Sequence, residues 1–143
     1  MFERFGTIGS RASSMRDRAS ILYIEDNRDS RLLVRRVLEA EGYTMLEAQT
    51  SAEGLRQLEQ HPVDLTLMDI NMPDMDGYTL AARIKAHPLH SNVPILAITA
   101  NAMQLDRERT LIAGCDGYIQ KPIDIDILVQ QLELFLKRDA NGS

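Results

Sequence analysis

The sequence predicts a doubly wound α/β domain, in which helices cover both faces of a parallel β-sheet. Short, almost continuously apolar runs alternate regularly with segments whose apolar residues recur at helical spacing. Such apolar runs are typical of parallel strands, because both of their faces are buried. Glycine, proline and polar turn residues separate the segments. A length of 143 residues suits one domain of this kind.

The first half of the chain contains three expected strands and two expected helices. The strands cover residues 21–24, 44–48 and 65–68, and the third ends on Asp69. The first helix carries apolar residues at helical spacing and stops at Gly42; these residues are Leu32, Leu33, Val37 and Leu38. A capping-box pattern over residues 50–53 opens the second helix, and His61-Pro62 ends it.

The second half continues the alternation after a loop over residues 71–77. We expect a helix over 78–86, a strand over 94–99, a helix over 104–113 and a strand over 117–120. The last helix is expected over 124–137, with four apolar residues on its inner side: Ile127, Leu128, Leu132 and Phe135. The prediction is therefore five strands and five helices in strict alternation.

Three segments make up the expected organisation of the chain. Residues 1–20 are rich in Ser, Gly and Arg and carry too few apolar residues for a core, so we expect a mobile lead-in. A basic arm for a partner or a membrane surface is the functional alternative. Residues 21–138 form the expected domain, and 139–143 form a short tail.

Composition excludes several classes of function. A net charge of −5 supplies no basic face for nucleic acid. No apolar run is long enough to span a bilayer, and the N-terminus has no signal-peptide pattern, so we expect no membrane insertion. The one cysteine, Cys115, is expected to be a small packing residue and fits a reducing compartment. We therefore expect a cytoplasmic protein.

Polar side chains gather where the expected strands end. In a doubly wound sheet, ligands bind beyond the carboxyl ends of the strands. The first strand is followed by Glu25 and Asp26, the third ends on Asp69, the fourth on Thr99, and the fifth is followed by Lys121. We therefore expect three carboxylates, one hydroxyl and one ammonium group at one edge of the sheet.

The chemistry of this cluster points to phosphoryl transfer. Carboxylates held close together repel one another unless a cation lies among them. Oxygen ligands without His or Cys favour Mg²⁺, with Mn²⁺ as an alternative, over zinc. A lysine and a hydroxyl suit the oxygens of a phosphoryl group. These are the parts needed to form an aspartyl-phosphate.

At this point the motifs resemble a known family. Glu25-Asp26, Asp69 within LMDINMPDMDG, Thr99-Ala100 and Lys121-Pro122 resemble, in order and spacing, the receiver domain of bacterial two-component response regulators, including single-domain, chemotaxis-regulator-like members. The resemblance covers residues 21–137. It implies a flavodoxin-like sheet with strand order 2-1-3-4-5. Glu25 stands where many such domains have aspartate, a familiar variant that bears only on fine metal geometry.

The resemblance also implies a role for each matching residue. Asp69 would accept the phosphoryl group, and Asp26 and Asp69 would bind Mg²⁺ with the backbone carbonyl of Asn71, while Glu25 would act through water. Lys121, with a cis bond to Pro122, and Thr99 would contact phosphoryl oxygens.

Two further residues complete the implied switch. Ala100 would leave room beside the phosphoryl group and offer its N–H. Tyr118 would be the aromatic side chain that rotates with Thr99; a half-buried packing tyrosine is the alternative.

The implied partners are proteins. The phosphoryl group would come from a sensor histidine kinase or a histidine phosphotransfer protein. A downstream target would bind the face formed by the helix over 104–113, the strand over 117–120 and the last helix, around Gln104, Tyr118 and Gln120. The chain would catalyse only its own phosphorylation and dephosphorylation. It would be a stand-alone receiver or part of a hybrid kinase or longer regulator.

Three rival functions share some of these features. Asp74-Met75-Asp76-Gly77 resembles the D-x-D-G signature of haloacid-dehalogenase phosphatases, but a loop with Pro73 precedes it instead of a strand. No glycine-rich nucleotide-binding motif follows the first strand. A receiver used only for docking, without phosphorylation, would not need the complete set of reactive residues. The three histidines, His61, His87 and His90, have no metal-ligand spacing.

Overall fold

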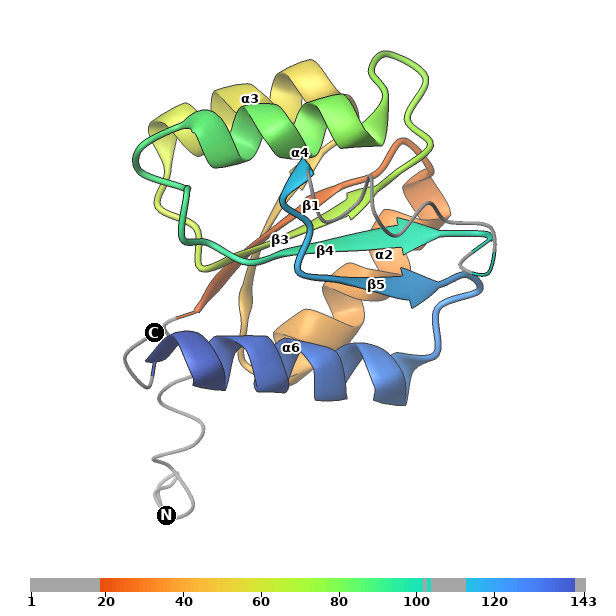
Figure 1. Cartoon of the computed structure of the whole chain (residues 1–143). Helices are drawn as coiled ribbons and strands as arrows, with labels where there is room; N and C mark the ends of the chain where they lie inside the picture. The colour runs from red at the N-terminus through yellow and green to blue at the C-terminus, as the bar shows by residue number, and fades with distance from the viewer. Residues whose placement is uncertain (1–18, 102, 104–112, 141–143) are drawn as a thin grey trace.

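The computed structural model describes residues 19–101, 103 and 113–140 (Figure 1). Most of the expected lead-in, the C-terminal tail from residue 141 and all but the last residue of the helix expected over 104–113 lie outside this part of the chain. In the described part, no helix is both long and apolar enough to cross a bilayer.

Five parallel strands form one sheet in the order β2-β1-β3-β4-β5. The strands are β1 (Ser20–Ile24), β2 (Thr44–Ala48), β3 (Leu65–Asp69), β4 (Ile95–Thr99) and β5 (Gly117–Gln120). The predicted doubly wound fold and strand order are confirmed. Because the strands are parallel, their carboxyl ends meet at one edge.

Four described helices cover the two faces of the sheet. They are α2 (Arg28–Ala40), α3 (Ser51–Gln60), α4 (Gly77–Ala86) and α6 (Ile125–Ala140). Figure 1 shows α3 and α4 on one face and α2 and α6 on the other. Each face has its own buried apolar cluster, and α2 and α6 share theirs with β1 through residues such as Leu38, Leu132 and Tyr23.

Two of the apolar residues at helical spacing in α2 are not buried. Leu32 and Leu33 are 45% and 43% exposed, whereas Arg31, Val34 and Leu38 form the buried face of α2. Residues three, four and seven apart share a helix face, so Leu38 groups with Arg31 and Val34.

In α6 the expectation for Ile127 was wrong, since it is 47% exposed while Leu128 and Leu132 are fully buried. Leu128 and Leu132 are four residues apart and so share one face, from which Ile127 points away.

The first strand begins one residue earlier than expected. Ser20 belongs to β1, where it pairs with Thr44, and its N–H donates to the Asp64 carboxylate at 2.7 Å. Ala19 is already buried. Backbone pairing with β2 therefore extends the strand one residue beyond its apolar run.

One glycine allows the loop after β3 to close tightly. A Cβ atom on Gly77 would lie 2.6 Å from the carbonyl oxygen of Ile70 and 2.7 Å from its Cα. Moving these backbone atoms would distort the end of β3, so only glycine fits at this position. Gly77, the first residue of α4, thereby packs against Ile70, the residue that follows Asp69 at the end of β3.

Candidate functional site

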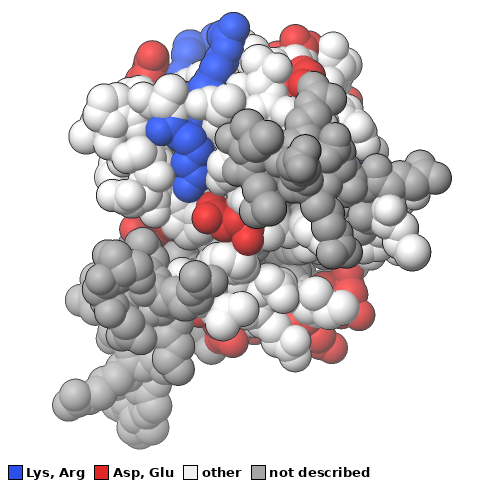
Figure 2. All heavy atoms as spheres, in the orientation of Figure 1, with Lys and Arg blue, Asp and Glu red and all other residues white. Residues whose placement is uncertain are grey.

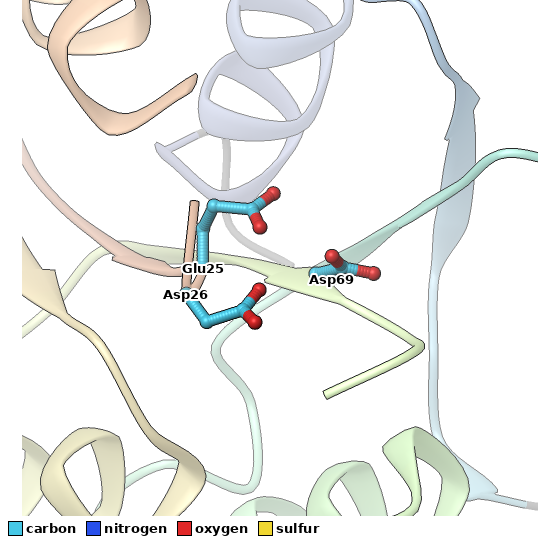
Figure 3. Close-up of side chains that lie close together, drawn as sticks. All are labelled: Glu25, Asp26 and Asp69. Atoms are coloured by element: carbon cyan, nitrogen blue, oxygen red, sulfur yellow. The ribbon is translucent and has the colours of Figure 1, made fainter. Parts of the chain in front are cut away.

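Three carboxylates converge at the carboxyl edge of the sheet. Glu25 and Asp26 follow β1, and Asp69 ends the neighbouring β3. One carboxylate oxygen from each residue lies within 4.8 Å of those from the other two. Figure 3 shows the three side chains pointing into one shared space. Glu25 and Asp69 are 1% and 5% exposed, while Asp26 is exposed, so the cluster opens to solvent on one side.

Lys121 brings one positive charge to the three carboxylates. Its Nζ lies 3.0 Å from Asp69 Oδ2 and 3.0 Å from Glu25 Oε1. Partial burial alone would lower the pKa of Lys121, but hydrogen bonds to Asp69 and Glu25 outweigh it and raise the pKa. The lysine therefore stays protonated and links the two buried carboxylates.

Glu25 is held from several sides. Its Oε1 accepts from the Tyr23 hydroxyl at 3.2 Å and its Oε2 from the Asn27 N–H at 3.1 Å. Burial raises the pKa of Glu25, and the nearby negative Asp69 adds to this; the Asn27 N–H and Lys121 work in the opposite direction. The site thus keeps a carboxyl group in a place where its charge is costly.

The backbone positions Asp69 and Lys121 opposite each other. The Asn71 N–H donates to Asp69 Oδ1 at 2.9 Å, which leaves Oδ2 to Lys121. The Lys121 N–H donates to the Thr99 carbonyl at 2.7 Å, so the end of β5 is tied to the end of β4. The Lys121–Pro122 bond is cis, as expected.

Thr99 and Ala100 lie at the carboxyl end of β4 and Tyr118 lies within β5, and their roles stay predictions. Thr99 is buried at the end of β4, where its hydroxyl accepts the Asn101 N–H at 3.1 Å. Ala100 is exposed, and its carbonyl accepts from the Gln120 side chain at 2.7 Å. Tyr118 is half-buried in β5 and packs against the apolar cluster beneath α3 and α4. Gln104 lies outside the described residues.

The donor set fits a hard divalent cation. All ligand atoms in the acidic cluster are carboxylate oxygens, which Mg²⁺ and Mn²⁺ prefer. Among the described residues, one ammonium group faces three carboxylates, so the cluster keeps an excess of negative charge. A cation bound there would offset that repulsion. The Asn71 carbonyl remains a predicted ligand.

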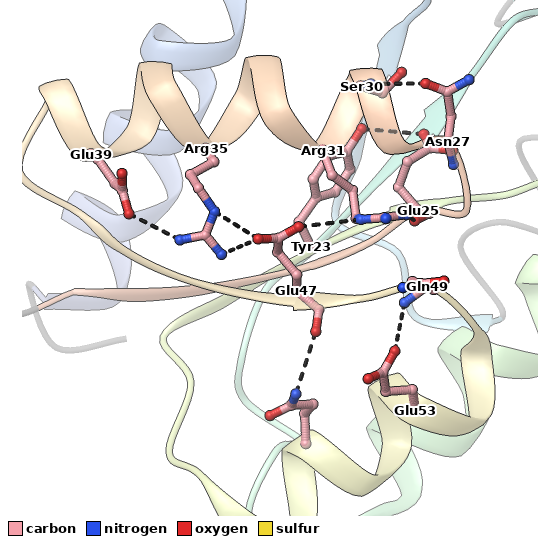
Figure 4. A network of polar contacts seen from close by, with 11 residues as sticks. Tyr23, Glu25, Asn27, Ser30, Arg31, Arg35, Glu39, Glu47, Gln49 and Glu53 are labelled. Carbon is pink, nitrogen blue, oxygen red and sulfur yellow. Dashed lines mark hydrogen bonds and ion pairs between the residues drawn. The ribbon is translucent and has the colours of Figure 1, made fainter.

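Sequence reasoning missed two residues that support the site. Arg31, buried in α2, donates from Nη1 to the Glu25 carbonyl at 2.7 Å and pairs with Glu47 of β2 through Nε at 3.2 Å (Figure 4). Tyr23 contacts the Glu25 carboxylate. The spacing of residues in the sequence could have indicated both. Tyr23 and Glu25 are two residues apart and so face the same side of an extended chain, and Arg31 has helical spacing with Val34 and Leu38.

The D-x-D-G signature belongs to two helix starts. Asp74 accepts hydrogen bonds from the N–H groups of Ser51 and Ala52, at the start of α3. Asp76 is the N-cap of α4 and accepts from the Tyr78 N–H. Carboxylates are favoured at helix N-termini by the free N–H groups and the helix dipole. Both aspartates therefore have a structural role at a helix start, and this motif no longer supports the phosphatase hypothesis.

The space-filling view shows charges of both signs on one face. Among the described residues in Figure 2, Lys and Arg form small groups rather than a continuous basic surface. The absence of nucleic-acid binding stays a prediction from the net charge of −5.

Comparisons with known proteins agree with the geometry. The family model for the response regulator receiver domain matches residues 21–133. The polar-differentiation response regulator DivK of Brucella ovis is 33% identical over 117 residues, which cover 82% of this chain and 95% of DivK. The sensor histidine kinase RcsC of Escherichia coli K12 is 34% identical over 128 residues, 90% of this chain; the match spans only 13% of RcsC.

A solved structure extends the likeness to three dimensions. The receiver domain of the sensor histidine kinase PA1611 from Pseudomonas aeruginosa PAO1 is 34% identical to this chain. The match covers 83% of this chain and 98% of that domain, with a TM-score of 0.77. That structure is described as having a magnesium ion coordinated in its active site cleft.

Proposed function

The chain belongs to the family of response regulator receiver domains, and from this premise we propose that Asp69 accepts a phosphoryl group in two-component signalling. The phosphoryl group would come from a phosphohistidine on a sensor histidine kinase or a histidine phosphotransfer protein. One observation carries the proposal: Lys121 Nζ lies 3.0 Å from both Asp69 and Glu25, within a cluster of three carboxylates.

The reaction follows from the position of Asp69. Its carboxylate oxygen attacks the phosphorus atom, the new P–O bond forms and the P–N bond to the donor imidazole breaks. The electron pair of that bond passes to the imidazole nitrogen, which takes up a proton. Asp69 Oδ1 is held by the Asn71 N–H, so the side chain is already oriented for attack.

Glu25, Asp26 and Asp69 would hold Mg²⁺ or Mn²⁺. When bound, the ion neutralises negative charge that accumulates on the transferring phosphoryl group. Lys121 would supply a second positive charge from the end of β5 and would pair with a phosphoryl oxygen. Thr99, the last residue of β4, and the N–H of Ala100, the next residue, would contact further oxygens.

Phosphorylation would bias a two-state surface. Lys121 and Thr99 would turn toward the phosphoryl group, and the bond from the Lys121 N–H to the Thr99 carbonyl would couple any backbone shift at the end of β5 to the end of β4. Tyr118 would follow this change. The face containing residues 104–113, β5 and α6 would then present different contacts to a target protein.

The chain would not turn over a separate substrate. It would catalyse only its own phosphorylation and dephosphorylation, in the cytoplasm. Its relatives include both a regulator of similar length, DivK, and a much longer kinase, RcsC. Either architecture, a stand-alone regulator or a part of a longer protein, is compatible with this chemistry.

The first experiment compares wild type with Asp69→Asn. After incubation with acetyl phosphate and Mg²⁺, we expect intact-mass spectrometry to show one added phosphate in wild type and none in the variant. The adduct should also be absent when EDTA removes the metal. Asp76→Asn, which alters a helix cap in the same segment, serves as the matched control and should be phosphorylated normally. An unchanged adduct in Asp69→Asn would refute the assignment.

A further inference from the structure

A tyrosine hydroxyl reaches the site from the core. Tyr23 is the next-to-last residue of β1, is fully buried and belongs to the apolar cluster that β1 shares with α2 and α6. A buried phenol needs a hydrogen-bond partner, because an unpaired hydroxyl in an apolar core is costly. Its hydroxyl donates to Glu25 Oε1 at 3.2 Å, two residues further along the same chain (Figure 4).

Glu25 is almost fully occupied by protein donors. Tyr23 and Lys121 both bond to Oε1, and the Asn27 N–H bonds to Oε2. A carboxylate accepts about four hydrogen bonds, so about one acceptor position stays free for a water or an ion. Glu25 therefore has one fixed orientation, with its remaining acceptor position available to the site.

This anchoring matters because glutamate is a long side chain. It has one more rotatable bond than aspartate and so more orientations to lose when it is ordered. Lys121 lies between Glu25 and Asp69, which means that a displaced Glu25 carboxylate would displace the ammonium group as well. The position of Lys121 thus depends on a contact made inside the core.

We propose that Tyr23 is a positioning residue, whose hydroxyl fixes the Glu25 carboxylate and through it the arrangement of Lys121 and the metal site. The inference rests on the proposed function, and it adds a residue outside the acidic cluster to that site. Tyr23 does not touch the phosphoryl group or the metal. It acts from the opposite side of Glu25.

The test removes the hydroxyl alone. In Tyr23→Phe, we expect Mg²⁺ affinity, measured by calorimetric titration without a phosphodonor, to fall by about 10-fold, as for other outer partners of metal ligands. Phosphorylation by acetyl phosphate should slow by a similar factor. Tyr43→Phe is the matched control: it removes another buried phenol hydroxyl from the same apolar cluster, at the amino end of β2, and should leave both quantities unchanged.

A double-mutant cycle separates positioning from packing. With Glu25→Gln already in place, the Tyr23→Phe change should alter Mg²⁺ affinity by less than about twofold, because the contact that it breaks no longer holds a metal-binding carboxylate. A full loss of affinity in this background, or no loss in the single variant, would overturn the proposal. Failure of wild type to become phosphorylated would instead count against the proposed function, since the Mg²⁺ affinities would still report on Tyr23.

A measurement on wild type covers the case in which Tyr23→Phe does not fold. The ring resonances of Tyr23 should shift during an Mg²⁺ titration followed by NMR, with the same midpoint as the calorimetric titration, and those of Tyr43 should not. Tyr23 resonances that ignore Mg²⁺ would refute the link between the hydroxyl and the metal site.

Discussion

Two charged clusters meet at Glu25, and they are balanced differently. On one side, Arg31 and Arg35 of α2 pair with Glu47 of β2, and Arg35 also pairs with Glu39 at 3.0 Å (Figure 4). Two positive groups therefore meet two negative ones. On the other side, the three carboxylates of the acidic cluster meet Lys121.

The difference separates a structural cluster from a candidate binding site. In the α2–β2 cluster every charge has a partner inside the protein, and Glu47 is 30% exposed, so water also contributes to its solvation. In the acidic cluster two buried carboxylates share the positive charge of one lysine. An unbalanced, partly buried charge is stable only with an added counter-ion or a shifted pKa. Proximity of charges alone would not have distinguished the two.

The largest effect should come from removing the cation of the acidic cluster. We expect Lys121→Met to slow phosphorylation by acetyl phosphate by at least about 100-fold, because the developing charge loses a fixed partner. Intact-mass time courses give the rate. Without metal the variant should also melt at a lower temperature, and Mg²⁺ should stabilise it more than it stabilises wild type, since the ammonium group no longer competes for the carboxylates.

The same substitution at a different lysine serves as the control for this prediction. Lys85→Met removes a lysine that pairs with Asp116 at 3.3 Å, away from the acidic cluster. It should leave the phosphorylation rate unchanged. Equal rates for Lys121→Met and wild type would show that Lys121 is only an ion-pair partner.

A smaller effect, on stability alone, should come from the balanced cluster. Glu47→Gln leaves Arg31 and Arg35 without their shared carboxylate, and we expect the free energy of unfolding to fall by about 1 kcal/mol in urea titrations. Phosphorylation and Mg²⁺ affinity should stay within about twofold of wild type. Glu39→Gln is the control, because its side chain is 55% exposed and its loss should be hard to measure. A strong loss of Mg²⁺ affinity in Glu47→Gln would mean that the two clusters are coupled through Arg31.

The smallest effect should come from Asp74, a carboxylate whose partners are backbone N–H groups. Its slight burial opposes the charged form, but hydrogen bonds from Ser51 and Ala52 outweigh this and lower the pKa of Asp74. We expect Asp74→Ala to cost about 0.5 kcal/mol at neutral pH, after allowing for solvent exposure.

The pH dependence of that cost has a definite sign. The folded pKa lies below the unfolded value of about 4, so the contribution is complete above about pH 4 and is lost as the pH falls through the folded pKa. Urea titrations of wild type and Asp74→Ala at several pH values would show their difference shrinking only in that acidic range. A difference that grows on acidification would contradict the assignment.

Local patterns were enough to predict the five strands, the four described helices and the charged residues that meet at the strand ends. The strand-end residues Glu25, Asp69, Thr99 and Lys121 could be predicted, because the end of each apolar run in the sequence indicates where a strand ends. The helix faces were less secure. Leu32, Leu33 and Ile127 are apolar and lie at plausible spacings, yet the packing of α2 and α6 leaves them exposed. Several helix faces can satisfy the same pattern, and only the neighbouring sheet selects one.

The alternation of strands and helices, the polar groups at the strand ends and the family could all be predicted from the amino-acid sequence, because they depend on order and spacing along the chain. Which charged groups contact one another depends on how the elements pack in the folded domain. Lys121 contacts Glu25 and Asp69 across 96 and 52 positions of sequence, and Arg31 reaches both Glu47 and the Glu25 carbonyl. Tyr23 turned out to be a donor to the site rather than a core residue alone. Distances between side chains on different elements are set by packing, which no local pattern encodes.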